Sequence, residues 1–298
     1  MIGIVVVNYN TWEISIECVN SIEKTCTLPY HIYIVDNCSV NDSFEKLKMK
    51  LDNNPNVTVV LLQKNGGYGY GLNCGGKIAI NDGCDAVIAS NNDIIYLNNS
   101  IEQMYKVLEE DETIGIVCVQ QLTILGDNMV SAIKNSDTAW SIALMFFPLC
   151  RIIFAKQFIA QKKLLRENTL QKVFCPNGGC YMFRSKVLED IGYYDENIFL
   201  YAEENIIGKK IEAKKYNVVL CPKARVIHSH RQTTGNDISL MQLRMASSIL
   251  YYGKEYLKWN ILQENSFKIW FYINATVKAM IRPNYRRRWK ELINVFNK

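Results

Sequence analysis

The chain has 298 residues, of which 49% are hydrophobic and 21% charged, with only 6 prolines. This is a globular composition, and it excludes an intrinsically disordered or fibrous protein. The net charge of +5 is unevenly spread, because residues 267–298 carry +7 and residues 151–172 carry +5, which leaves −7 for the rest of the chain. Two basic segments on an acidic body predict an anionic partner, either a membrane or a nucleic acid.

The first half of the chain alternates strand and helix patterns. Apolar runs predict strands at 2–7, 32–35, 57–62, 86–89 and 114–119, and amphipathic segments predict helices from Thr11 and over 42–51, 71–81 and 101–109. Strands that alternate with helices predict an α/β fold of Rossmann-like type, with a mostly parallel central sheet flanked by helices.

The second half of the chain is less regular. Residues 126–172 look like an insertion that faces a membrane or an acceptor, with an apolar block at 140–154 followed by a basic run. Residues 237–298 look helical, basic and aromatic. We therefore expect one domain over 1–236, which includes the insertion, and a helical C-terminal extension over 237–298.

Cysteines and termini indicate the compartment. The ten cysteines form no CxxC pair and are spread through the predicted elements, as is typical of reduced core residues in a cytosolic protein. Met1 leads into an apolar run without the basic segment or cleavage site of a secretory signal, so none is expected. The most apolar stretch, 139–150, is too short to cross a bilayer.

Polar clusters follow four of the apolar runs. These clusters are Asn8, Asp36 with Asn37, Asn65 with Gly66, and Asn92 with Asp93. Each alone is a turn signal. Because the carboxyl ends of parallel strands meet at one edge of a sheet, the four together predict a polar rim around a crevice.

The glycine-rich loop at 65–75 does not match the dinucleotide pattern GxGxxG, since Leu72 and Cys74 stand where glycine is required. It also follows the third predicted strand instead of the first. A helix that begins near Gly71 could still offer free N–H groups to a phosphate.

Two sets of side chains are candidates for chemistry. Asp93 at a strand end suits a divalent cation, and His228 and His230 share one face of an alternating run, so we expect one of them at the ion. Glu203 and Glu204 follow an apolar run, and burial there would raise the pKa of a general base. The alternatives are a turn aspartate, a structural histidine, and acids at a helix N-terminus.

Eight short segments, taken in order, resemble the family 2 glycosyltransferases of the GT-A fold, particularly the rhamnosyltransferase-like branch that builds bacterial surface polysaccharides. The segments are VVVNYN at 5–10, IVDN at 34–37, NGGY at 65–68, SNND at 90–93, NGG at 177–179, IGYYDE at 191–196, FLYAEE at 199–204, and Ala224-x-Val226-x-His228.

The resemblance implies a role for each matching residue. The nucleotide-sugar donor would be bound by Asn8, Tyr9, Asn10, Asp36, Asn37, Asn65, Gly66, Gly71, Asn73, Asn92 and Asp93. Asp93 and His228 would hold Mg²⁺ or Mn²⁺ on the diphosphate, Glu204 or Glu203 would be the catalytic base, and Asn177, Gly178 and Gly179 would bind the acceptor.

This sequence departs from the family pattern at three places. The base position carries Glu204 instead of the commoner Asp, and Ile206 stands where a second Asp is usual. Residues 233–235 read Thr-Thr-Gly where Gly-x-Ser is common.

The resemblance implies an inverting, metal-dependent transferase that uses dTDP-rhamnose or a UDP-sugar, with a glycan or a polyprenyl-diphosphate-linked saccharide as acceptor. The basic C-terminal region would then hold the enzyme peripherally on the inner face of the cell membrane. There, Trp270, Phe271, Tyr272, Met280 and Ile281 interleave with Lys268, Lys278, Arg282 and Arg286–Arg288.

Three alternatives are kept open. The C-terminal region could form a homodimer contact instead of a membrane anchor. The chain could be a non-catalytic nucleotide-sugar-binding homologue. It could also bind nucleic acid through its basic tail, although no nucleic-acid motif is present and no such partner is expected.

Overall fold

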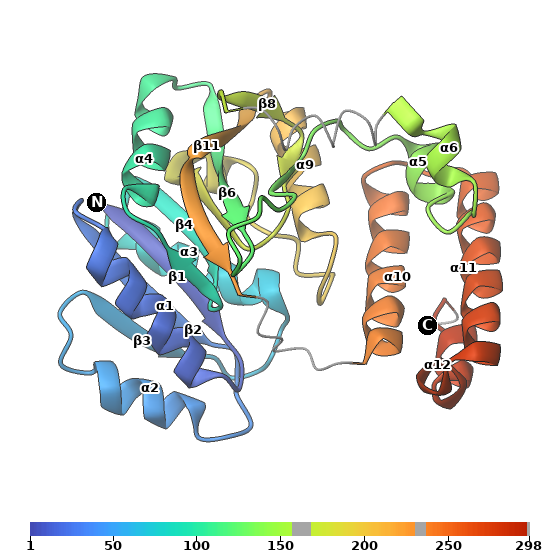
Figure 1. Ribbon diagram of the computed structural model, residues 1–298, viewed down its shortest axis with the longest axis horizontal. Helices are drawn as coiled ribbons and strands as arrows, with labels where there is room; N and C mark the ends of the chain where they lie inside the picture. The colour runs from blue at the N-terminus through green and yellow to red at the C-terminus, as the bar shows by residue number, and fades with distance from the viewer. Residues whose placement is uncertain (157–167, 230–236, 297–298) are drawn as a thin grey trace.

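The computed structural model describes residues 1–156, 168–229 and 237–296. Among these residues, nine strands form one mixed sheet with helices on both faces (Figure 1). Eight follow in the spatial order β3 (Val57–Leu61), β2 (Tyr30–Asp36), β1 (Ile2–Asn8), β4 (Ala86–Asn91), β10 (Cys180–Arg184), β6 (Ile114–Leu122), β11 (Asn217–His228) and β5 (Ile94–Tyr96), and β8 (Gln171–Val173) pairs with β11.

The sheet is mostly parallel, which confirms the predicted α/β class. Strands β1 to β4 run parallel, as do β6 and β11. Strand β10 lies antiparallel between β4 and β6, and β5 and β8 are also antiparallel to β11. Strands β4 and β6 are therefore separated by β10, a strand that comes much later in the chain.

Strand β1 shows why its sequence is continuously apolar. Ile4 and Val6 pack into the core on one face of the sheet, whereas Val5 and Val7 pack into the core on the other. One face of the sheet is covered by apolar side chains from α1 (Trp12–Thr25), α2 (Ser43–Leu51) and α4 (Ser100–Glu110). The other face is covered by side chains from α3 (Tyr68–Asn81), α8 (Ser185–Asp190) and α9 (Glu203–Ala213). A strand covered on both faces needs apolar side chains at successive positions.

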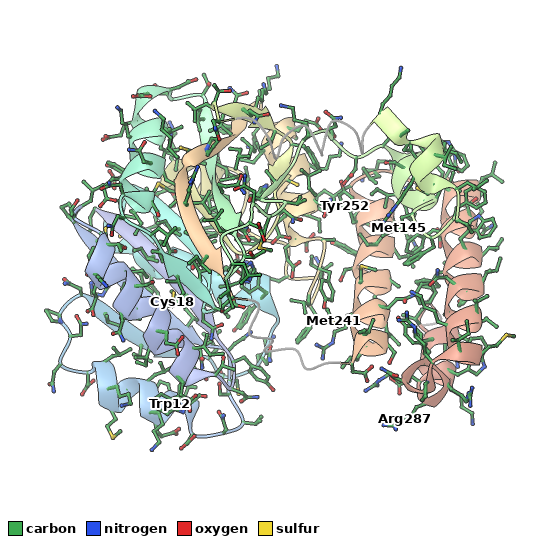
Figure 2. The ribbon with its side chains drawn as sticks, in the orientation of Figure 1. Trp12, Cys18, Met145, Met241, Tyr252 and Arg287 are labelled. Atoms are coloured by element: carbon green, nitrogen blue, oxygen red, sulfur yellow. The ribbon has the colours of Figure 1, made fainter. Side chains whose placement is uncertain are left out.

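A layer of helices lies beside the α/β part (Figure 1). It contains α10 (Ile238–Glu255), α11 (Ile261–Ile281), α12 (Pro283–Arg287) and α13 (Trp289–Ile293). This confirms a helical C-terminal region. Figure 2 shows Arg287 at the end of this layer.

The insertion joins the same layer through α5 (Ala139–Ala143) and α6 (Cys150–Ile153), while β7 (Ala132–Ile133) and β9 (Cys175–Pro176) form a small separate sheet. Phe146 packs on Phe267 and Phe271 with ring centroids 5.5 and 5.4 Å apart, and Phe147 lies 4.5 Å from Trp270. Phe146 and Phe147 of the apolar block therefore pack on the helical layer, whereas Leu149, Ile152 and Ile153 are exposed. That the insertion faces a membrane or an acceptor stays a prediction. The basic residues at 162, 163 and 166 lie outside the described residues.

All ten cysteines are free thiols, and seven of them are buried. No described helix combines the length and the apolarity that a bilayer span requires.

Candidate active site

The structure brings the four polar clusters together at one edge of the sheet. Pairing of β1 with β2 sets Asn8 opposite Asp36, and pairing of β1 with β4 sets Val7 opposite Asn91. Hydrogen bonds then join the clusters directly. Asn8 Nδ2 donates to Asp36 Oδ2 at 2.7 Å, and Asn37 Nδ2 donates to the Gly67 carbonyl at 2.9 Å.

Asn8 and Asp36 form a closed internal network, since both have no exposed surface. The Ser39 hydroxyl donates to Asp36 Oδ2 at 2.7 Å, and its backbone N–H donates to Asp36 Oδ1 at 2.8 Å. Ser15 Oγ donates to Asn8 Oδ1 at 2.8 Å, and Asn92 Nδ2 donates to Ser15 Oγ at 2.9 Å. Asn8, Asp36 and Asn92 thus hold the loops after β1, β2 and β4 in place.

The half-buried residues next to this network are Tyr9 and Asn10. Asn10 adopts a left-handed backbone with φ 61°, and its side-chain oxygen accepts from the Val40 N–H at 2.8 Å. Asn37 Oδ1 is buried and has no hydrogen-bond partner within the described part of the chain. An unpaired buried acceptor is costly, so this atom is a candidate contact for a ligand N–H.

The glycine-rich loop turns into α3 earlier than predicted, at Tyr68 instead of near Gly71. Gly67 has φ 94°, and a Cβ there would lie 2.2 Å from the Phe199 carbonyl oxygen, so only glycine allows this approach. That same oxygen accepts from the Tyr68 N–H at 3.2 Å, and Asn65 Oδ1 accepts from the Gly67 N–H at 3.1 Å.

Three predicted donor residues lie in close packing instead of at the crevice surface. A Cβ on Gly66 would meet the Tyr70 ring at 2.4 Å, and a Cβ on Gly71 would lie 3.1 Å from Val7. Asn73 is 2% exposed, and its amide accepts from the Tyr194 N–H and donates to Glu196 Oε1, both at 2.8 Å. Its amide thus hydrogen-bonds to the loop after α8, and a direct contact of Asn73 with the donor stays a prediction.

Asp93 and His228 lie next to each other, because β5 pairs with β11 and sets His228 opposite Ile94. Asp93 Oδ1 is 3.2 Å from His228 Nε2, and both residues are buried. Gln121 Oε1 lies 2.8 Å from His228 Nδ1, while Gln121 Nε2 donates to the Gly178 carbonyl at 2.7 Å. That second bond orients the amide, so Nδ1 donates to Gln121 Oε1, and Nε2 is the ring nitrogen that faces Asp93.

A ring nitrogen and a carboxylate oxygen that face each other form a donor set for a cation, so these residues fit a divalent metal. Among the described residues no group of three or more His, Cys, Asp or Glu could hold a metal ion. The pair would therefore supply two ligands and leave the remaining positions to diphosphate and water. His230, the alternative ligand, lies outside the described residues.

Glu203 and Glu204 form the first turn of α9, and they follow Tyr201 and Ala202, which have φ 74° and 70°. Two consecutive left-handed residues other than glycine are strained, and such strain clusters at functional sites. Burial and the neighbouring Glu204 charge raise the pKa of Glu203 to about 8, and burial also raises the pKa of Glu204. Glu203 and Glu204 therefore lie at a helix N-terminus and also have raised pKa values.

The Gly178 and Gly179 turn lies between the two sets of functional side chains. Both glycines are left-handed, with φ 65° and 76°. A Cβ on Gly178 would lie 3.5 Å from Glu204 Oε1, and a Cβ on Gly179 would lie 2.8 Å from Gln121 Oε1. The Asn177 side chain donates to the Val130 carbonyl at 2.7 Å.

Sequence reasoning missed Gln121, which connects the turn to the metal pair. The available signal was a pair of glutamines directly after the predicted apolar strand at 114–119. It also did not anticipate that Ile206, in place of a family Asp, would be buried against Tyr252 of α10, which Figure 2 labels at the junction between α10 and the α/β part.

The fold and the site define a GT-A glycosyltransferase. A family model described as "Glycosyl transferase family 2" matches residues 3–192, and the chain belongs to this family. It is therefore an enzyme of the glycosyltransferase class. The alternative of a non-catalytic homologue is accordingly set aside.

The chain is 26% identical over 235 residues to "Uncharacterized glycosyltransferase YwdF" of Bacillus subtilis, a match that covers 79% of this chain and 76% of that protein. Solved structures share the fold at low identity. GalNAc-T7 with UDP, GalNAc and Mn²⁺ has a TM-score of 0.61 at 16% identity, covering 100% of this chain and 56% of that chain.

Two further structures show the same fold. The mannosyltransferase PcManGT from Pyrobaculum calidifontis, in complex with GDP-Man and Mn²⁺, has a TM-score of 0.56 at 14% identity, covering 99% of this chain and 84% of that chain. S. aureus TarS 1-349 in complex with UDP-GlcNAc has a TM-score of 0.56 at 13% identity, covering 99% and 89%.

Proposed function

We propose that this glycosyltransferase moves a sugar from a nucleoside diphosphate, bound with Mg²⁺ or Mn²⁺, to a saccharide hydroxyl with inversion of configuration. The observation that carries the proposal is the Gly178 and Gly179 turn. On one side it adjoins Glu204, and on the other it is bonded through Gln121 to His228 and Asp93. The proposed base and the two proposed metal ligands thus lie on either side of one turn.

Donor binding is supported by the rim and by the ligands of the fold relatives. Those relatives hold UDP, GDP-Man or UDP-GlcNAc. The unpaired Asn37 Oδ1 can accept from the ring N–H of uracil or thymine, which both carry one. This contact fits the two donors that we propose, a UDP-sugar or dTDP-rhamnose, although guanine carries a ring N–H as well. Tyr9, Asn10 and Asn65 would lie beside the nucleotide.

The divalent cation, when bound, supplies charge neutralisation on the leaving nucleoside diphosphate. Asp93 and His228 would hold it, and the hydrogen bond of Gln121 to Nδ1 would orient the His228 ring so that Nε2 faces the ion. Glu204 takes the proton of the acceptor hydroxyl as that oxygen attacks the anomeric carbon. Burial raises the pKa of both Glu203 and Glu204. Because two adjacent buried carboxylates resist double ionisation, one of the pair keeps a proton and the other is left ionised to act as the base. A single displacement inverts configuration.

The test begins with a thermal-shift screen of nucleoside diphosphate sugars with Mn²⁺. With the donor that stabilises most, we expect Glu204→Gln to lower turnover by a factor on the order of 10² to 10⁴, with UDP affinity unchanged. Glu212→Gln, an exposed acid on the same helix, is the matched control. Wild-type turnover in Glu204→Gln would remove Glu204 from the mechanism, and a larger loss in Glu203→Gln would give Glu203 the role.

We further propose that the enzyme is peripheral on the inner face of the cell membrane and acts on a polyprenyl-diphosphate-linked or glycan acceptor. An exposed apolar stripe, made of Ile269, Ile273, Val277, Met280 and Ile281, runs along α11 opposite its buried face, and Arg282 and Arg287 are exposed beyond its end. Charge and apolar surface together suit anionic lipid. Phe271, expected in this surface, is instead fully buried in the helical layer.

A further inference from the structure

We propose that a pocket between the loop around Phe199 and helix α10 is an acceptor subsite for an anionic group on a saccharide, either a phosphate or a carboxylate. The pocket has a volume of about 390 Å³, and its lining includes Asn197, Phe199, Arg244, Ser247 and Tyr251. The inference rests on the proposed function, because it takes the ligand to be the acceptor of the transferase.

Arg244 supplies the charge that such a group needs. It is half-buried on α10, and its guanidinium carbon lies 5.0 Å from the centroid of the Phe199 ring. Within the described part of the chain, Arg244 forms no ion pair. Asp195, the acid that contacts α10, instead accepts hydrogen bonds from the Tyr251 and Tyr256 hydroxyls, at 2.9 and 2.7 Å. A planar guanidinium without a carboxylate partner in a pocket is suited to bind phosphate or carboxylate in bidentate fashion.

The rest of the pocket suits the sugar that carries the charge. Phe199 is 41% exposed, and its ring offers an apolar face for the C–H face of a pyranose. The exposed Ser247 hydroxyl and the Asn197 side chain offer hydrogen bonds to hydroxyl groups. The volume falls at the lower end of the range for small-molecule sites, which is enough for about one or two sugar units.

The pocket is also in the right place relative to the proposed base. Phe199 precedes Glu204 by five residues, so the two are at most about 18 Å apart even if the chain were fully extended. The left-handed pair Tyr201 and Ala202 shortens this path. The Phe199 carbonyl in addition accepts from the Tyr68 N–H of the donor loop. An acceptor whose hydroxyl reaches Glu204 would therefore place a neighbouring unit at Arg244.

Binding can be measured on the full chain without donor or metal. Ile198 and Leu243 both line the pocket, so their methyl resonances in ¹³C-methyl-labelled protein report on its occupancy. The probes are N-acetylglucosamine 1-phosphate, glucuronic acid, neutral N-acetylglucosamine and inorganic phosphate. We expect saturable shifts of these methyls with the two charged sugars, and at least tenfold weaker binding of the neutral sugar and of phosphate alone.

Arg244→Gln should weaken binding of the charged sugars at least tenfold, Arg244→Lys should give an intermediate loss, and Arg282→Gln, an exposed cation outside the pocket, should have no effect. Phe199→Leu keeps the charge and should weaken the sugars but not phosphate. Absence of shifts at Ile198 and Leu243, or wild-type affinity in a folded Arg244→Gln, would overturn the proposal. Inorganic phosphate that binds as tightly as the sugar phosphate would also overturn it. Failure of the wild-type protein to bind UDP, or wild-type turnover in Glu204→Gln, would instead contradict the proposed function.

Discussion

Among single residues, Gln121 links the two halves of the site. Its oxygen orients the ring of His228, while its nitrogen holds the Gly178 carbonyl. Residues that orient metal-ligating histidines typically change metal affinity 10- to 100-fold when they are removed. Gln121 is 1% exposed, so it has no role in solubility or surface charge.

We predict that Gln121→Leu lowers Mn²⁺ affinity about 10- to 100-fold, because the His228 ring loses the acceptor that orients it. Isothermal titration of Mn²⁺ in the presence of UDP measures this without turnover. Gln120→Leu is the matched control, since Gln120 is also buried but bonds to Ser131 and the Met129 carbonyl. Equal Mn²⁺ affinity in the two variants would exclude the orienting role.

The Glu203 carboxyl makes stability depend on pH. Its pKa is raised from 4.5 to about 8 in the folded protein, so between these values the folded state binds a proton that the unfolded chain has released. The free energy of unfolding therefore falls as pH rises from about 5 to about 8.

Glu203→Gln should remove this dependence. We expect the variant to gain stability relative to the wild type by at least about 1.4 kcal/mol between pH 5 and pH 9, the equivalent of one pKa unit. Urea denaturation at both pH values measures the difference, with Glu212→Gln as control. Parallel behaviour of the wild type and Glu203→Gln across this range would contradict the burial argument.

Among the elements, α10 ties the helical layer to the loop before Glu203, at residues 195–200. Asp195 accepts hydrogen bonds from the Tyr251 and Tyr256 hydroxyls, and Ser248 Oγ donates to the Leu200 carbonyl at 2.8 Å. Burial alone would raise the pKa of Asp195, but hydrogen bonds from Tyr256, Asn197 and Tyr251 lower it below its ordinary value. The ionised carboxylate is thus the preferred form in this contact.

Asp195→Ala should destabilise the protein by about 1 to 3 kcal/mol, because two tyrosine hydroxyls lose a charged partner. Asp190→Ala is the control, since Asp190 accepts from a single hydroxyl, that of Tyr216, and pairs with Lys214 in an exposed position. Chemical denaturation compares the two variants. If Asp195→Ala costs no more than Asp190→Ala, the contact does not hold α10 to the loop.

For the whole molecule, the question is what covers the exposed stripe on α11. We predict that the protein floats with vesicles that contain anionic lipid, floats less with neutral vesicles, and loses binding in Ile273→Gln/Met280→Gln, because each buried CH₂ is worth about 0.8 kcal/mol. Met49→Gln, an exposed apolar position on α2, is the control. A stripe variant that still floats would contradict membrane docking. Membrane docking would also be contradicted if the wild-type protein does not float but forms a dimer in gel filtration, and the stripe variant is a monomer.

Local patterns in the sequence were enough to predict much of this protein. Buried strands must be apolar at successive positions, and polar residues at their ends must meet at one sheet edge, so the α/β class and the rim at Asn8, Asp36 and Asn92 followed directly. The same rule predicted Asp93 at this edge. Strand periodicity predicted that His228 or His230 faces it, and the family resemblance indicated His228.

Only the tertiary structure decided the features that depend on contacts between distant residues. Gln121 meets Gly178 and His228 across 57 and 107 residues of chain, and β10 inserts between β4 and β6 from far along the sequence. On α11 the sequence shows apolar residues nearly all around, so only packing against α5 and α10 separates buried Phe271 from exposed Ile273. Hydrophobic periodicity reports that a side chain is apolar, whereas the partner that covers it is set by the fold as a whole.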